Sequence, residues 1–451
     1  MRDVAVLLLI IGLVPVILRK PWIGIIAWFV ISLLNPHKLT WGFAQELPVA
    51  NVVGLATLAG LLVTKEKRAV ALSPEMILLL LFAAFVTLTT IFSWNPQYAW
   101  AQWWKVMKIY LMVFVTSMLI FGQYRIKALF YTVAGCLAFF GLKGGVFSIL
   151  GGGQQRVQGH AGFMNGNTDL GLGMAMALPL IYAVAAEQPS GWRRWAGWGT
   201  FWLTVIATIF TYSRGAWLGL AAVMALLFFY SKRKLLIVSC ILPLMIAAVP
   251  FIPEQVFNRA DTIESFEQDH SSMMRIQAWG VAFNVAKSNP LGAGFAIDFT
   301  PNERWLSYAS FLGEWYNQTR SAHSIYFQVL GEHGFVGLAL FVSMLVMTFI
   351  TLGRVKASAK RAGPAAGNFA AYAGALQIGL VGYCVSGAFL NLAYFDMLYL
   401  YMILGAVMIR DLTQIPAHGG SVSQPGGSRP QRPSSAEQEG RARSTLGVSN
   451  R

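Results

Sequence analysis

Long uninterrupted apolar runs constrain the fold of this chain more than any other feature. The clearest cover residues 76–92, 106–121, 198–210, 218–230, 235–251, 335–352 and 395–409. An α-helix needs about 20 apolar residues to cross the roughly 30 Å hydrocarbon core of a bilayer. The shorter runs would need flanking residues or a thinned bilayer to cross. We therefore predict an all-α polytopic membrane protein with about 12 transmembrane helices.

Composition supports a membrane protein and argues against a nucleic-acid partner. Of the 451 residues, 56% are hydrophobic and only 12% are charged, whereas soluble domains carry roughly 25% charged residues. The net charge is +15, but the basic residues fall in short clusters between apolar runs: Lys65/Lys67/Arg68, Arg125/Lys127, Arg193/Arg194, Lys232/Arg233/Lys234 and Arg354/Lys356/Lys360/Arg361. Cytoplasmic loops of membrane proteins are enriched in Lys and Arg. The excess of basic residues therefore indicates which loops are cytoplasmic and does not indicate a nucleic-acid partner.

Placing every basic cluster in the cytoplasm gives a consistent topology, because two crossings separate each cluster from the next. It predicts that the remaining connections lie outside: 94–104, 151–168, 211–215, 253–322 and 390–394. The first apolar runs, 4–18 and 22–34, are short. Both runs cross, or together they form one re-entrant or interfacial hairpin. The sequence therefore leaves open how residues 1–34 cross, once or twice.

The chain divides by composition into a membrane domain and a tail. Residues 1–412 form the predicted transmembrane domain, with loop 253–322 outside the membrane. Residues 413–451 are rich in Gly, Ser, Pro and Arg, and such a segment cannot bury enough apolar surface to order itself. We predict a disordered cytoplasmic tail. The three cysteines, Cys136, Cys240 and Cys384, lie in apolar runs and are interpreted as buried small hydrophobes.

The polar loop 253–322 delivers a histidine to the start of an apolar run. It holds 8 of the 19 acidic residues, and it ends in Arg320-Ser-Ala-His323. Within it, residues 271–286 have the apolar periodicity of a helix. On a continuous helix, Gly334 and Gly337 would lie on the stripe below His323, with Glu332 and His333 at the membrane interface. His323 is a candidate catalytic residue, and a purely structural histidine at a helix start is the alternative.

Two arginines are candidates to bind an anion. Arg214 lies in the short turn Ser213-Arg214-Gly215 between two apolar runs, where a charge is costly unless it meets an opposite charge. A snorkelling interfacial arginine is the alternative. Arg275 lies on the polar flank of the predicted loop helix, and an ion pair with a nearby acid such as Asp269 is equally open.

Four further residues are secondary binding candidates. Lys143 interrupts an apolar run, which by default suggests function, although snorkelling explains it as well. Arg156 follows Gly151-Gly-Gly, and Asn165 and Asn167 flank a glycine. Such segments can bind anions and sugars, and a plain Gly/Asn turn is the alternative. The sequence has no Asp-x-Asp, His-x-x-x-His, Cys-x-x-Cys or Walker-type motif, so we predict neither a metal nor a cofactor.

Together these motifs resemble the bacterial O-antigen ligase and polymerase superfamily. The family pattern of His, then Asn/Ser/Gln, nine residues, Gly and two residues before a small or aromatic residue is matched by His323-Ser324, Gly334 and Gly337. The family's ligase arginines match Arg214 in Ser-Arg-Gly and Arg275 in Arg-x-x-x-Trp. The resemblance covers roughly residues 70–410. Asn35-Pro-His and Asn165-Gly-Asn167 are similar to the exosortase-associated O-glycosylation ligase branch.

The resemblance implies a GT-C-like glycosyltransferase in the bacterial inner membrane with a periplasmic active site. It would transfer a glycan from undecaprenyl diphosphate to an acceptor hydroxyl, without a metal and with inversion. Arg214 and Arg275 would neutralise the diphosphate, with Lys143, Arg156, Asn165 and Asn167 as secondary contacts. His323 would act as the base or as an orienting group. The acceptor, lipid A-core sugar or protein Ser/Thr, stays open. So do a polysaccharide polymerase and a non-enzymatic transporter of lipid-linked glycans.

Overall fold

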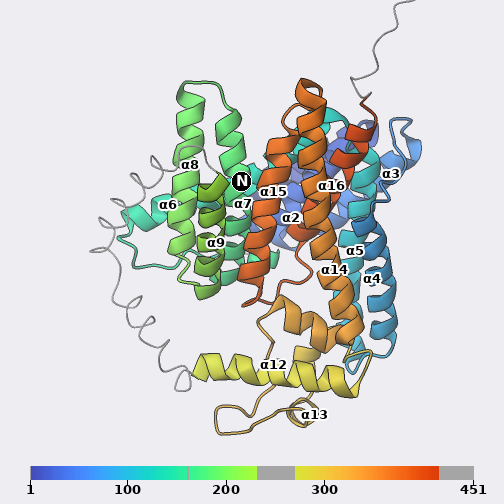
Figure 1. The fold of residues 1–451 in the computed structure, drawn as a ribbon, viewed down its shortest axis with the longest axis vertical. Coiled ribbons are helices and arrows are strands. Elements are labelled where there is room, and N and C mark those ends of the chain that lie inside the picture. The colour runs from blue at the N-terminus through green and yellow to red at the C-terminus, as the bar shows by residue number, and fades with distance from the viewer. Residues whose placement is uncertain (1, 160–161, 231–269, 416–451) are drawn as a thin grey trace, which may run out of the picture. The chain divides into compact units, whose positions relative to one another are not determined.

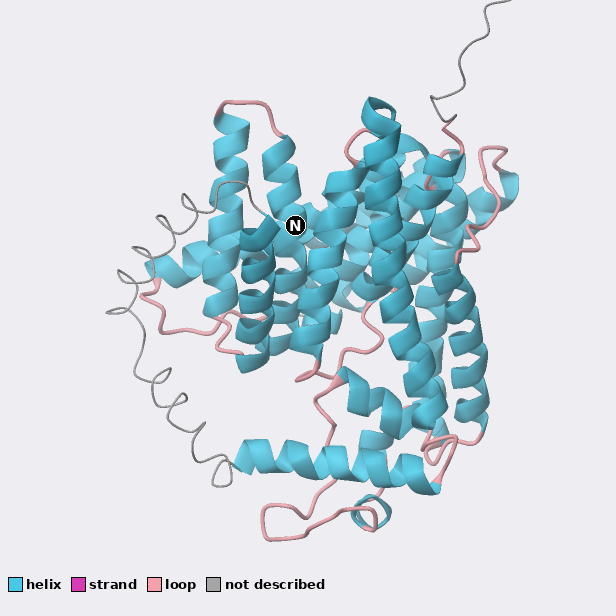
Figure 2. Cartoon of the chain, in the orientation of Figure 1, coloured by secondary structure: helices cyan, strands magenta, loops and turns pink. Residues whose placement is uncertain are grey.

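The computed structural model describes residues 2–159, 162–230 and 270–415, and these residues form helices and loops without a strand (Figures 1 and 2). The first six helices are α1 (Arg2–Arg19), α2 (Pro21–Leu34), α3 (Val49–Val63), α4 (Pro74–Ile91), α5 (Pro96–Leu119) and α6 (Gly122–Leu150). The rest of the described chain contains α7 (Asn167–Glu187), α8 (Trp192–Ile209), α9 (Arg214–Tyr230), α12 (His270–Ser288), α13 (Asn302–Leu306), α14 (Ile325–Ala362), α15 (Phe369–Gly387) and α16 (Asp396–Thr413). Short 3₁₀ turns cover Pro36–Leu39, Phe43–Glu46, Gly162–Met164, Ile297–Phe299 and Gly363–Ala366.

Five of these helices are long and apolar enough to cross a membrane: α4, α6, α7, α14 and α15. Three shorter helices, α2, α3 and α9, are also apolar. The prediction of an all-α polytopic membrane protein is therefore confirmed. The number of about 12 crossings stays a prediction, and one of the apolar runs behind it, 235–251, lies outside the described residues.

The interior of the bundle is built around α7 and α16. Nearly every residue of α16 from Asp396 to Met408 is buried, and α7 is buried over most of its length. Helix α15 packs against α7, α9 and α14, while α16 packs against α5 and α14. A helix that is apolar on all sides can be buried on all sides, which is why these two segments lie inside.

The N-terminal segment forms two helices, with a break at Lys20 and proline at the first position of α2. Proline favours this position because its missing N–H has no partner within a helix anyway. Both helices pack on α3. The Ser32 hydroxyl of α2 donates a hydrogen bond to the Asp396 carboxylate at the start of α16, which ties the N-terminal helices to the interior.

Helix α12 lies across one end of the bundle, roughly at right angles to the long helices (Figure 1). It confirms the helix predicted over 271–286, and its predicted apolar stripe is largely buried, at Ala278, Val281, Ala282 and Val285. Helix α12 packs against α14. The loop therefore folds onto the bundle, although its residues 253–269 lie outside the described part.

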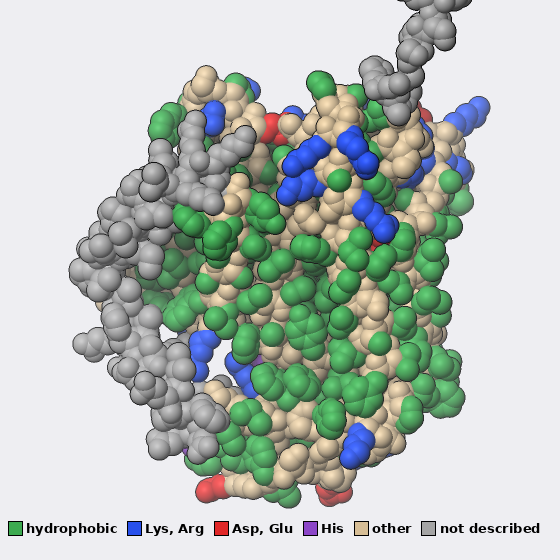
Figure 3. Space-filling model, in the orientation of Figure 1, with side chains coloured by type: hydrophobic (Ala, Val, Ile, Leu, Met, Phe, Trp, Pro, Cys, Tyr) green, Lys and Arg blue, Asp and Glu red, His purple; other side chains and the backbone are tan. Residues whose placement is uncertain are grey.

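The face of the molecule shown in Figure 3 is apolar in the middle and basic toward one end. Figure 3 shows hydrophobic side chains over the middle of the visible face, and Lys and Arg gathered mainly toward the end opposite α12. The compact unit extends through Ile415, and α16 reaches Thr413, one residue beyond the predicted domain limit at 412. The tail predicted to be disordered begins at residue 413, and its residues 416–451 lie outside the described residues, as does Cys240. Cys136 is buried and Cys384 partly buried.

Candidate functional site

His323 lies two residues before the first residue of α14, with its side chain exposed. Its backbone has φ +45°, a left-handed conformation that non-glycine residues adopt uncommonly. The next residue, Ser324, is buried, and its carbonyl accepts the first hydrogen bond of the helix from Gln328 N at 2.8 Å. The turn therefore buries the serine and presents the imidazole outward. Strained backbone of this kind tends to occur at functional sites.

Helix α12 brings Arg275 close to His323. Trp279, one helical turn after Arg275, donates a hydrogen bond from Nε1 to the carbonyl of Ala322 at 2.7 Å. The same indole stacks on Phe327, with ring centroids 5.1 Å apart and 6° between the planes. Residues four apart lie on one face of a helix. Because Trp279 contacts residues on both sides of His323, the same helix face also holds Arg275 next to His323.

The surroundings of His323 favour its neutral form. Partial enclosure by the protein, followed by the positive charge of Arg275, lowers the pKa of His323 below its usual 6.5. A neutral imidazole can accept a proton. Figure 3 shows Lys or Arg side chains just above α12, with a His next to them. The site thus combines a proton acceptor with cationic groups at an open surface.

Helix α14 is broken at Gly334, which corrects the predicted glycine stripe. Gly334 has φ +64° and ψ −169°, so the helical projection from His323 does not extend past it. The segment after α12 pairs with this break, since Ala293 N donates to Gly331 O at 2.9 Å and Gly294 N to Glu332 O at 2.8 Å. A Cβ at Gly334 would lie only 2.2 Å from the Pro290 carbonyl oxygen. The close approach of the backbone at residues 290–294 explains why residue 334 is a glycine.

Both residues just before the break, Glu332 and His333, are buried within the protein, and their predicted position at the membrane interface stays a prediction. His333 is fully buried, and its Nδ1 lies 2.6 Å from the Thr89 hydroxyl. Its ring meets Phe295 edge-on at 4.6 Å. At Gly337 a Cβ would lie 2.3 Å from the Cβ of His333. Gly337, the second glycine of the motif, therefore makes room for His333.

Arg214 is the first residue of α9 and is half-buried. The turn before it is held by two other segments of the chain. Asn167 at the start of α7 donates from Nδ2 to the carbonyl of Thr211 at 2.7 Å, and the Tyr212 hydroxyl donates to the carbonyl of Gly153. Tyr212 has φ +52°. This second strained turn fixes the direction in which the α9 N-terminus points.

The C-terminal end of α15 connects the Arg214 turn with the start of α14. A Cβ at Gly215 would lie 3.1 Å from the Cβ of Phe389, and a Cβ at Gly387 would lie 2.6 Å from Cδ1 of Ile325. Gly215, which follows Arg214, and Ile325, the first residue of α14, thus pack against the same turn. The structure places the two site segments on either side of residues 386–389.

The secondary candidates fall in different places. Arg156 is exposed beside the Arg214 turn, because the adjacent Val157 N donates to Phe210 O at 3.0 Å. Asn165 is exposed. The amide of Asn167 is already used to hold Thr211, which points to a positioning role. Lys143 is exposed on the α6 face opposite the buried glycines 141, 144 and 145, among apolar side chains that are also exposed.

Sequence reasoning gave no role to three residues of this region. Arg320, half-buried, has a buried Nε without a hydrogen-bond partner among the described residues. Glu332 and Tyr394 are buried and hydrogen-bonded to each other at 2.6 Å. The sequence did contain a signal for Glu332, because an ionisable residue next to an apolar run is a candidate for a functional role. Nothing in the pattern around Tyr394 indicated its partner.

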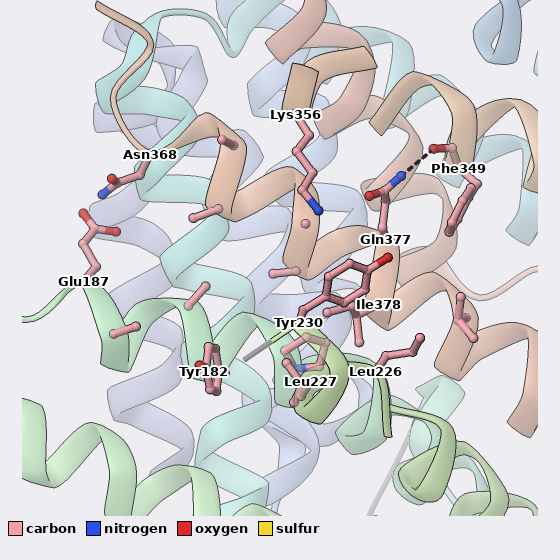
Figure 4. Close-up of a pocket in the computed structure, with 18 residues that line it drawn as sticks. Tyr182, Glu187, Leu226, Leu227, Tyr230, Phe349, Lys356, Asn368, Gln377 and Ile378 are labelled. Atoms are coloured by element: carbon pink, nitrogen blue, oxygen red, sulfur yellow. Dashed lines mark hydrogen bonds between the residues drawn. The ribbon is translucent and has the colours of Figure 1, made fainter. Parts of the chain in front are cut away.

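A separate cavity of about 410 Å³ lies among α7, α9, α14 and α15 (Figure 4). Its lining is mostly apolar, with Lys356 and Tyr230 at one side, the ammonium lying 4.7 Å from the ring centroid. None of the predicted site residues lines it. We therefore place the candidate site at the α12 end.

Comparison with known families agrees with this geometry. Residues 199–342 match the O-antigen ligase family, and residues 1–184 match a family of unknown function, DUF5935. No curated protein was found to be similar to the chain. The first match contains Arg214, Arg275, His323 and the break in α14, whereas the second covers α1–α6 and most of α7. The match over residues 199–342 supports the O-antigen ligase superfamily for this part of the chain.

Proposed function

We propose that this protein transfers a glycan from a polyprenyl diphosphate, undecaprenyl diphosphate in bacteria, to an acceptor hydroxyl. The observation that carries the proposal is the exposed His323 beside Arg275, fixed by Trp279 at an open surface. A proton acceptor next to a fixed cation suits a reaction between a hydroxyl and a phosphorylated donor. The O-antigen ligase match over the same residues supports the same class of reaction.

The arginines serve the leaving group. A lipid diphosphate is already a stable anion, so it needs charge neutralisation more than protonation as the glycosidic bond breaks. Arginine supplies it with a planar fork of donors that fits phosphate oxygens. Arg214 and Arg275 take this role, with Arg156 beside the Arg214 turn as a secondary contact. The Nε of Arg320, which has no hydrogen-bond partner within the described part of the chain, offers a further donor for an anionic oxygen.

His323 serves the acceptor. The hydroxyl oxygen forms a bond to the anomeric carbon while the bond from that carbon to the phosphate oxygen breaks. The hydroxyl proton passes to the neutral imidazole of His323 and then to solvent, and the diphosphate leaves with the bonding electron pair. In-line attack inverts the anomeric centre. In this scheme no metal takes part, and Asn165 and Asn167 bind sugar or hold the turn.

The charge distribution supports an extracytoplasmic site. Basic side chains gather mainly at the end opposite α12 (Figure 3), and that end is cytoplasmic under the positive-inside rule. The proposal therefore includes a GT-C-like fold of about 12 crossings in the bacterial inner membrane, with the site facing the periplasm. Lys143, among exposed apolar side chains, is then placed to contact donor lipid. The acceptor is a lipid A-core sugar or a protein Ser/Thr, the latter if the chain belongs to the exosortase-associated branch.

The test is glycan transfer by the purified, reconstituted full chain. Lipid-linked glycan is supplied with lipid A-core or with a Ser/Thr-containing protein, and the product is resolved on a gel. We expect transfer to one of the two acceptors, resistance to EDTA, and at least a hundredfold loss in His323→Ala, within the range for removing a general base. Long polymer on the donor lipid would indicate a polymerase. Donor translocation without any glycan product would indicate a transporter.

A further inference from the structure

The Glu332 carboxylate lies at the junction of three segments of the site. It is 3% exposed, and each of its oxygens accepts a hydrogen bond from a different element. Ala296 N donates to Oε1 at 3.0 Å, and the Tyr394 hydroxyl donates to Oε2 at 2.6 Å. A buried carboxylate is costly unless it is hydrogen-bonded in this way, so its position is strongly determined.

Each of the three segments leads to a residue of the proposed reaction. Glu332 itself ends the first part of α14, which begins next to His323. Ala296 belongs to the segment that continues from α12, the helix of Arg275. Tyr394 belongs to the connection between α15 and α16, whose earlier part packs against Gly215, next to Arg214.

A second contact shows that the same connection is attached near the start of α14 as well. Gln328 Oε1 accepts a hydrogen bond from Ala393 N at 3.3 Å, one turn after His323. Phe295 fills the space between these segments, edge-on to Tyr394 with centroids 5.0 Å apart. The carboxylate is thus the shared acceptor of a packed junction below the site. It does not reach the open surface where substrate would bind.

We propose that Glu332 is a positioning residue, which holds His323 and Arg275 in their mutual arrangement through Tyr394 and Ala296. The inference rests on the proposed glycan transfer. A glutamine has one acceptor oxygen instead of two. In Glu332→Gln the amide oxygen can still accept from Ala296 N–H, but the amide NH₂ then faces the Tyr394 hydroxyl, which must accept instead of donate. The Tyr394 attachment is reversed and both hydrogen bonds lose their charge assistance, so the junction is weakened and the α14 start can shift relative to α12.

The experiment compares Glu332→Gln, Tyr394→Phe and their combination in the full chain. A matched control is Glu75→Gln, because Glu75 is another fully buried carboxylate that accepts hydrogen bonds from Ser73 at 2.6 Å and from Thr351 of α14 at 2.7 Å. It contacts the same helix far from His323. Each variant is measured for kcat, for the donor KM and for its thermal unfolding midpoint in detergent.

We expect Glu332→Gln to lower kcat by about 10- to 100-fold, as a misplacement near 1 Å can do, with the donor KM within about threefold. Tyr394→Phe should lower kcat in the same direction. The combined variant should be no worse than Glu332→Gln alone within about twofold, because the two groups act as one unit. Glu75→Gln should keep kcat whatever happens to its unfolding midpoint.

Two results overturn the positioning role. One is a Glu332→Gln enzyme with the wild-type kcat. The other is a loss of activity that Glu75→Gln reproduces at the same decrease in the unfolding midpoint, since that marks general destabilisation. Both are distinct from failure of the proposed function, in which the wild-type chain transfers no glycan or His323→Ala transfers it normally.

Discussion

Trp279→Phe tests whether the α12 anchor sets the geometry of the site. Trp279 makes two contacts beside His323, the hydrogen bond to the Ala322 carbonyl and the stacking on Phe327. Phenylalanine keeps an aromatic ring for the stacking and removes only the N–H donor. The substitution therefore isolates the bond that joins α12 to the residue before His323.

The magnitude follows from the burial of the acceptor. Ala322 is 6% exposed, and a buried carbonyl that loses its donor costs about 1–3 kcal/mol. If the whole cost fell on the transition state, kcat would fall about 5- to 150-fold, because about 1.4 kcal/mol is tenfold in rate. Water can approach from the exposed side of His323, so we expect a loss of about 5- to 10-fold.

The assay is initial-rate glycan transfer at saturating donor, with the donor KM and the thermal unfolding midpoint measured in parallel. Trp103→Phe is the matched control, because Trp103 donates from Nε1 to the Thr87 hydroxyl at 2.8 Å, between α5 and α4. It should lose stability without losing kcat. If Trp279→Phe retained the full kcat, or if both variants lost it equally, the anchoring argument would be refuted.

Two further predictions concern the charge beside His323 and the break in α14. Burial and Arg275 lower the pKa of His323, so the proton-accepting form should be lost only as pH falls through a value below 6.5. Arg275→Gln should move the acid limb of the kcat/KM profile to higher pH, and an unmoved limb would contradict this coupling. Gly334→Ala should lower the unfolding midpoint by several degrees, because φ is +64° and the new Cβ would lie 2.2 Å from Pro290 O. Gly135→Ala, whose Cβ would meet nothing within 4 Å, should not lower it, and an equal decrease in both would exclude backbone strain as the cause.

The helices and their membrane character were accessible from sequence because they depend on local apolar length and periodicity. The helix predicted over 271–286 exists, and its apolar stripe is largely buried. The pairing of His323 with Arg275 was expected only through family resemblance. No local rule specifies which helix crosses the mouth of a bundle, or that an indole will reach the carbonyl before the histidine.

The stripe predicted below His323 failed for a definite physical reason. The projection assumed an unbroken helix, whereas Gly334 leaves helical geometry so that the backbone of residues 290–294 can approach. Glycine allows this conformation without requiring it, so the sequence alone could not distinguish a packing glycine from a break. The same break draws Glu332 and His333 into the interior.

By itself, the sequence determined that this chain is a helical membrane protein, because membrane character follows from composition and apolar length along the chain. It also nominated His323, Arg214 and Arg275 as site residues, a prediction that depends on the family resemblance. Only the tertiary structure decided that α12 brings Arg275 to His323, that α15 links the Arg214 turn to α14, and that a buried carboxylate joins these segments. Such contacts connect residues far apart in the chain, and their energies depend on burial and on partners that exist only after folding.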